Sequence, residues 1–211
     1  MAQKCPCGTF YIMNHPLTQS DFSHLTGTNC YCSEESAAAI RQAVSELPLN
    51  SVHFIGTGDY HYISLFWAER IREPFRLVLF DNHPDDQPSA FGGDTLSCGS
   101  WVRDVRALPL CAGVHWIRRA ADGGCLELPD GLPLYLSIDL DVLSVHYAHT
   151  DWDQGDMTLD ELCGLIRGLK GRRRIIGADI CGGLTMEKGA SAEDLALNAG
   201  TAEAVMDLLY D

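Results

Sequence analysis

Five aspartate and histidine side chains directly follow two apolar runs: Asp81, His83 and Asp85 after residues 77–80, and Asp139 and Asp141 after residues 134–138. Carboxylate oxygens with an imidazole nitrogen suit Mn²⁺, Zn²⁺ or Fe²⁺ better than a metal that prefers thiolates. Carboxylates this close together repel one another unless a cation lies between them. The D-x-H-x-D and D-x-D spacings therefore predict a metal site.

A third motif strengthens this interpretation. Without this third motif, the D-x-H-x-D segment around His83 could equally be explained as a turn, because Asp and Asn favour turns. However, His61 ends the segment Gly56-Thr57-Gly58-Asp59-Tyr60-His61, which follows another apolar run, residues 52–55. If all three runs are parallel strands, their carboxyl ends meet in one crevice. A period of two would also point Asp139 and Asp141 to the same face of their strand.

The elements that must position these residues alternate along the chain. Apolar strand-like runs and amphipathic helical stretches take turns, which is typical of a mainly parallel sheet covered on both faces, a three-layer α/β/α sandwich. The predicted strands are residues 9–13, 52–55, 76–80, 114–117, 134–138 and 174–178. The predicted helices are residues 34–46 after the N-cap Ser33, 62–71, 101–108, 158–169 after a capping box, and a C-terminal helix from 191. The segment between the strand 9–13 and Ser33 and the segment from 82 to 97 are predicted as irregular.

Composition limits the class of protein. The chain has 211 residues, 46% of them hydrophobic, which suits one α/β domain over 1–211. Its net charge of −14 argues against a nucleic-acid partner, which requires clustered Lys and Arg. The start of the chain lacks the apolar run of a signal peptide, and the apolar runs are too short to span a membrane. We expect a cytoplasmic protein with a small-molecule substrate; a homo-oligomer is left open.

Nine cysteines are present, four of them in the N-terminal segment 1–32 as two C-x-C units: Cys5 and Cys7, then Cys30 and Cys32. Four thiolates could bind a structural zinc ion. The one-residue spacer is tighter than the two-residue spacer of zinc ribbons, which favours free thiols instead.

The three motifs resemble those of the ureohydrolase superfamily, which includes arginase, agmatinase and formimidoylglutamase. In that family a Gly-Gly-Asp-His motif, D-x-H-x-D and S-x-D-x-D follow one another at the ends of parallel strands. The second is complete here, and the third is complete as Ser137, Asp139 and Asp141. The first is altered, because one residue separates Asp59 from His61. The resemblance covers residues 52–180.

The resemblance implies an arginase-like fold and two Mn²⁺ ions, with Zn²⁺ or Fe²⁺ as alternatives. It implies that Asp81 and Asp139 bridge the ions, that His61 and Asp85 complete one site, and that His83 and Asp141 complete the other. A hydroxide between the ions would attack a carbon that bears nitrogen, in an amidine, a guanidino group or an amide. Asp85 and Asp141 are then the candidate catalytic carboxylates, orienting the nucleophile and relaying its proton.

Two departures from the family concern the substrate. Cys98 occupies the region where arginase-like members carry a proton-shuttling His. The family often continues its last strand with Asp-x-x-Glu, whose Glu holds a guanidinium, whereas here Asp179 is retained and Gly182 stands in place of the Glu. This argues against arginine or agmatine bound in the usual way. The predicted substrate-binding residues are Cys98, Asp179 and, in the loop after D-x-D, His146.

Two other hypotheses remain open. The related deacetylase fold holds a single Zn²⁺ with Asp, His and Asp, and His61 and Asp141 would then be superfluous. A non-catalytic member of the arginase fold would bind metal or a small ligand without turnover, since metal alone does not make an enzyme. The retention of four mutually repelling carboxylates speaks against the second.

Overall fold

Strands from both halves of the chain form one seven-stranded sheet. The computed structural model describes residues 9–12, 15–89, 93–124 and 126–210. The strand order is β1-β2-β4-β9-β8-β5-β7, and every pairing is parallel except that of β1 with β2. The strands are β1 Thr9–Ile12, β2 His15–Gln19, β4 Val52–Phe54, β5 Phe75–Phe80, β7 Cys111–Ile117, β8 Leu134–Asp139 and β9 Ile175–Cys181.

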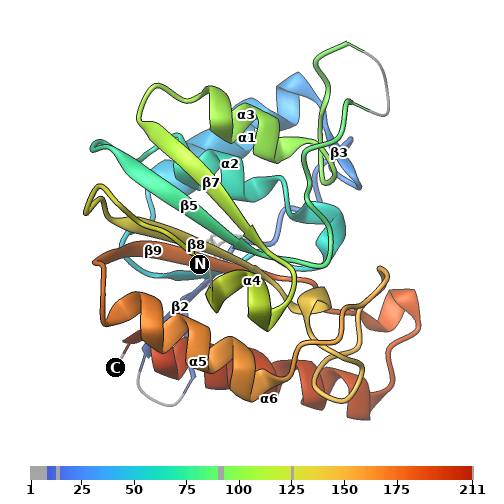
Figure 1. Ribbon diagram of the computed structural model, residues 1–211. Helices are drawn as coiled ribbons and strands as arrows, with labels where there is room; N and C mark the ends of the chain where they lie inside the picture. The colour runs from blue at the N-terminus through green and yellow to red at the C-terminus, as the bar shows by residue number, and fades with distance from the viewer. Residues whose placement is uncertain (1–8, 13–14, 90–92, 125, 211) are drawn as a thin grey trace.

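Helices cover both faces of this sheet (Figure 1). On one side lie α1 Glu34–Ser45, α2 Ile63–Ala68 and α3 Trp101–Ala107, and on the other α4 Ala120–Gly124, α5 Leu159–Lys170 and α6 Ala192–Tyr210. The predicted three-layer α/β/α sandwich is therefore confirmed. None of the helices in the described part of the chain is both long and apolar enough to cross a membrane.

The buried residues 77–80 of strand β5 show how the sheet is held between its two layers. Leu77 and Leu79 pack in the core with α1, α2 and α3, while Val78 and Phe80 pack in the core with α5 and α6. Successive strand residues point to opposite faces, so a strand covered on both faces must be apolar at every position. The apolar run ends where the chain leaves the sheet, at Asp81.

Sequence reasoning missed several elements near the chain start and in the loops. The segment containing β2 was predicted as irregular, and Pro16 within it argues against a strand, but β2 pairs with β1 and β4. The short strand β6 Leu96–Ser97 falls at the end of a predicted irregular stretch and pairs with β3 Tyr31–Cys32. The helix α4 was also missed, because its five residues include two glycines.

One buried histidine gives the fold a pH dependence. His53 on β4 is fully buried, with its ring stacked on Trp67 at 3.4 Å between centroids. Burial lowers the pKa of His53 from 6.5 to about 3. The unfolded chain therefore binds a proton below about pH 6.5 that the folded protein does not bind until about pH 3, so stability falls as pH decreases through this window.

We expect His53 to account for a loss on the order of a few kcal/mol across that window. Denaturant unfolding of the wild type and of His53→Gln, at a series of pH values from neutral to acidic, measures this contribution. The wild type should lose more stability on acidification than the variant. Equal losses in both proteins would show that His53 takes up its proton in the folded state as readily as in the unfolded chain.

Candidate metal centre

Four neighbouring strands, β4, β9, β8 and β5, end at the same edge of the sheet. After β4 a short 3-10 turn, Gly58–Tyr60, leads to His61. Asp81 follows β5 directly, and Asp139 is the last residue of β8. The parallel order of the strands is what gathers side chains from distant parts of the sequence.

The Nδ1 atom of His61 faces three carboxylates. It lies 3.1 Å from Asp81 Oδ2, 3.1 Å from Asp85 Oδ2 and 3.4 Å from Asp139 Oδ2. His61 and Asp81 are each 1% exposed, and neither His61 Nδ1 nor Asp81 Oδ2 has a hydrogen-bond partner among the described residues. Adjacent donors around an octahedral ion at about 2.1 Å lie roughly 3 Å apart, so this spacing fits a shared divalent ion.

A second group of donors adjoins the first. His83 Nδ1 lies 2.8 Å from Asp141 Oδ2 and 3.5 Å from Asp81 Oδ1. Asp81 thus turns one oxygen toward His61 and the other toward His83. It belongs to two groups of potential ligands. The first is His61, Asp81 and Asp85, and the second is Asp81, His83 and Asp141. Asp81 therefore lies between the two imidazoles, with one oxygen facing each.

Asp139, the other expected bridging carboxylate, contacts a different set of neighbours from Asp81. Its Oδ2 atom faces His61 and Cys181, with which it forms a third group of potential ligands, and its Oδ1 atom accepts a hydrogen bond from the Asp141 amide at 2.9 Å. Strand periodicity is also not what aligns Asp139 with Asp141. The strand ends at Asp139, and Asp141 lies in the 3-10 turn Leu140–Val142, whose curvature brings the second carboxylate round to His83.

The carboxylates of the cluster repel one another, and positive charge between them would relieve this repulsion. Burial, together with the neighbouring Asp141 and Asp81, raises the pKa of Asp139 well above its usual range, and burial raises the pKa of Asp141 to about 6. Hydrogen bonding to Asp141 raises the pKa of His83 to about 10. Without a cation the cluster relieves its repulsion by holding protons, and divalent ions would supply the same positive charge.

Partners outside the cluster fix the orientation of the ligands. His61 Nε2 lies 2.9 Å from Ser137 Oγ, which donates a hydrogen bond of 2.6 Å to Asp179 Oδ1. On the other side, the Trp101 indole N–H donates to Asp85 Oδ2 at 2.7 Å. Metal-binding histidines generally engage their second ring nitrogen in this way, which sets the ring orientation and the tautomer.

The Ser137 contact gives a testable effect on metal affinity. In Ser137→Ala, His61 loses its orienting partner, and we expect metal affinity to fall by about 10–100-fold. Ser64→Ala is the matched control, because Ser64 Oγ lies 3.2 Å from Ser137 Oγ but leaves the contacts from Ser137 to His61 and Asp179 in place. Titration of the metal-free proteins by calorimetry measures both. An unchanged affinity in Ser137→Ala would contradict the orienting role.

The cluster forms the floor of a pocket of about 280 Å³. Cys98, one of the residues predicted to bind substrate, lines this pocket. Trp152 also lines it, its ring 6.0 Å from that of His83 and its indole N–H donating to Asp59 Oδ1. His146 is exposed and is not among the lining residues, and Asp179 is fully buried behind Ser137. The structure therefore does not bring these last two to the pocket.

The structure also shows the surroundings of Asp59, in the altered first motif, and of the second cysteine pair, Cys30 and Cys32. Asp59 accepts hydrogen bonds from Asn29 and Lys188, so its carboxylate is engaged away from the cluster that His61 enters. No group of potential metal ligands within the described residues contains Cys30 or Cys32. Cys5 and Cys7 lie outside the described residues. Sequence reasoning missed Cys181, since no spacing rule connects a lone thiol on β9 to the three motifs.

Comparisons with known proteins identify the chain's similarities in sequence and in fold. No family model matches the chain. An uncharacterized protein of Thermotoga maritima is 35% identical over an alignment of 149 positions, which covers 62% of this chain and 57% of that protein. The chain thus spans little more than half the length of this relative.

Several solved structures share the fold of this chain. Proclavaminate amidino hydrolase from Streptomyces clavuligerus superimposes with a TM-score of 0.63 at 17% identity, covering 83% of this chain and 68% of that one. Arginase from Medicago truncatula gives 0.63 at 16%, covering 84% and 65%. A triple mutant of a T. brucei arginase-like protein, bound with Mn²⁺, gives 0.60 at 17%, covering 89% and 69%. The chain has the fold of these proteins, and the predicted resemblance to the ureohydrolases is confirmed at the level of the fold.

Proposed function

We propose that this protein is a metal-dependent hydrolase of a non-peptide C–N bond that uses two divalent ions. The observation that carries this proposal is the position of Asp81, with one oxygen toward His61 and the other toward His83. The single-zinc alternative gives no reason for this arrangement, because it requires neither His61 nor Asp141. The names of the structural neighbours, which include amidino hydrolases and arginases, support the same class of reaction.

The donors suit two ions of the Mn²⁺ type. His61, Asp81, Asp85 and Asp139 would hold one ion, and Asp81, His83 and Asp141 would hold the other, with Zn²⁺ or Fe²⁺ as alternatives. The Mn²⁺ in one structural neighbour is consistent with this choice. When bound, two such ions supply a nucleophile at neutral pH and polarise the group under attack.

The protein's own residues would position the reaction and handle its proton. Asp85 and Asp141 are the candidate catalytic carboxylates, because each lines the pocket and has one oxygen fixed by an N–H donor. The donor is the Trp101 indole for Asp85 and the Asn82 backbone amide for Asp141. A carboxylate held in this way can accept a proton from an attacking water without losing its position.

The pocket suits a compact substrate, and its lining, within the described part of the chain, offers no carboxylate, apart from the proposed metal ligands, to pair with a positively charged substrate group. Among the described residues that line it, the carboxylates are Asp81, Asp85, Asp139 and Asp141, all of them proposed ligands. Gln87 and Cys98 offer weaker polar contacts at its side. A neutral amide fits this lining best, because an amidinium or a guanidinium would lack a dedicated carboxylate for its positive charge.

Turnover by the metal-loaded protein tests this function. Protein loaded with Mn²⁺ is incubated with amidines, formimino compounds, guanidino acids and amides, and released ammonia or urea is measured. We expect release from at least one amidine or amide, its loss on chelation, and its absence in His83→Ala. Binding of two ions without release from any of these classes would favour the non-catalytic alternative.

We further propose that the protein acts on its small-molecule substrate in the cytoplasm. Six cysteines in the described part of the chain are free thiols: Cys30, Cys32, Cys98, Cys111, Cys163 and Cys181. Free thiols in this number suit a reducing compartment.

A further inference from the structure

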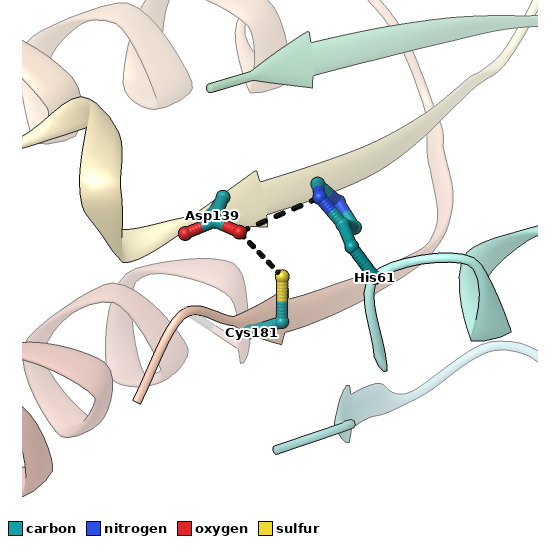
Figure 2. Close-up of side chains that lie close together, drawn as sticks. All are labelled: His61, Asp139 and Cys181. Atoms are coloured by element: carbon teal, nitrogen blue, oxygen red, sulfur yellow. Dashed lines mark hydrogen bonds and ion pairs between the residues drawn. The ribbon is translucent and has the colours of Figure 1, made fainter. Parts of the chain in front are cut away.

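A buried thiol lies against the metal-binding cluster. Figure 2 shows Cys181, at the end of β9, pointing toward the carboxylate of Asp139, which also faces His61. Cys181 Sγ is 3.0 Å from Asp139 Oδ2, and His61 Nδ1 is 3.4 Å from the same oxygen. Cys181 is 0% exposed, His61 1% and Asp139 3%, so all three side chains are buried.

The fold places this thiol through strand register. β8 and β9 run parallel, with Ser137 opposite Asp179 and Asp139 opposite Cys181. The period of two therefore puts Cys181 on the same face as Asp179, which supports His61 through Ser137. Directly after Cys181 the chain turns at Gly182, whose φ is +88°.

The surroundings of Cys181 differ from those of a cysteine that merely fills space. Cys163, on α5, lies outside the groups of potential metal ligands found among the described residues. Cys181 instead meets a carboxylate and belongs to a group of potential ligands with His61 and Asp139. The buried Nδ1 atom of His61, without a hydrogen-bond partner in the described part of the chain, independently marks this spot as a ligand position.

Resting on the two-ion function proposed above, we propose that the Cys181 thiolate is a further ligand of the ion held by His61. The thiol proton leaves to solvent when the metal–sulfur bond forms. His61, Asp139, Cys181 and a carboxylate oxygen of Asp81 or Asp85 then offer one nitrogen, one sulfur and two oxygens. This set suits Zn²⁺ or Co²⁺, which accept thiolates, better than Mn²⁺, which prefers oxygen.

The two ion positions would consequently differ in preference. The group of Asp81, His83 and Asp141 contains no sulfur and suits a harder ion. The position at His61 would prefer a thiophilic ion. The metal centre would then have two unlike ion positions, in contrast to a symmetrical pair of manganese ions.

Titration of metal-free full-length protein with Co²⁺ under anaerobic conditions tests this inference. Visible d–d bands report that Co²⁺ has bound, and a near-ultraviolet sulfur-to-cobalt charge-transfer band reports a thiolate ligand. We expect both signals in the wild type. In Cys181→Ser and Cys181→Ala the d–d bands should remain and the charge-transfer band should disappear, and Zn²⁺ affinity should fall by about tenfold or more.

Cys98→Ser is the matched control, because Cys98 is a cysteine that lines the pocket beside the cluster, and it should keep the charge-transfer band. Co²⁺ binding to the wild type without this band would overturn the thiolate ligand while leaving the two-ion function intact. Loss of the band in Cys98→Ser but not in Cys181→Ser would overturn it by assigning the sulfur to Cys98. Failure of the wild type to bind Co²⁺, Zn²⁺ or Mn²⁺ at all would overturn this inference and the proposed function together.

Discussion

Asp81→Asn is expected to lose both metal ions and, with them, about 10³-fold or more of the turnover. Asp81 turns an oxygen toward each of His61 and His83, so a neutral amide at this position weakens both ion positions at once. The fold should survive, because the Asn side-chain oxygen can still accept the hydrogen bond that the His83 amide donates to Asp81 Oδ1. Elemental analysis of the purified variant, with circular dichroism as a check on folding, measures the effect.

Asp153→Asn is the control for charge removal near the pocket. Asp153 is exposed in the loop that carries Trp152, and it belongs to none of the ligand groups found among the described residues. This variant should keep the wild-type metal content and turnover. A folded Asp81→Asn protein that still holds two ions would remove the bridging role from Asp81 and with it the main support for a two-ion centre.

The second large effect concerns Gly182, which stands where ureohydrolases often carry the substrate-binding Glu. A Cβ atom on Gly182 would lie 2.0 Å from Asp139 Oδ1 and 2.7 Å from the Leu140 nitrogen, and its φ of +88° is unfavourable for any other residue. Gly182→Ala should therefore destabilise the protein by roughly 3–5 kcal/mol, from backbone strain and steric overlap together. Gly182→Glu should do the same and should not create a guanidino hydrolase.

Gly189→Ala separates the two causes. Gly189 has a φ of +91°, but a Cβ atom there meets nothing within 4 Å, so only the strain of about 1–2 kcal/mol is expected. Chemical denaturation of both variants gives the comparison. If the two glycines tolerate Ala equally well, Asp139 is not pressed against the chain at Gly182, and the position could accept a side chain after all.

A mainly parallel, buried sheet could be predicted from the sequence because two of its central strands are almost entirely apolar. Residues 77–80 are all apolar, residues 134–138 are apolar except for Ser137, and an Asp follows each run. Strand ends of a parallel sheet meet at one edge, so the six potential ligands could be grouped before any coordinates were known. His61 could be selected over Asp59 only through the resemblance, and the contact of Asp59 with Lys188 gives the physical reason.

The remaining features depend on tertiary contacts that a sequence pattern does not encode. Cys181 reaches the cluster through its register with Asp139 on the neighbouring strand. Asp141 turns toward His83 because a 3-10 turn follows β8, whereas a continued strand was expected. His146 follows D-x-D closely in sequence, yet the loop carries it to the surface and brings Trp152 to the pocket instead.

The metal content of the wild-type protein, purified without chelator and then reconstituted with Mn²⁺ or Zn²⁺, tests the two-ion centre most directly. We expect close to two ions per chain, because Asp81 belongs to two sets of donors. One ion per chain, retained when His61 or Asp141 is replaced by Ala, would contradict this expectation and favour a single-zinc site. No bound ion after reconstitution would show that the gathered carboxylates serve some purpose other than metal binding.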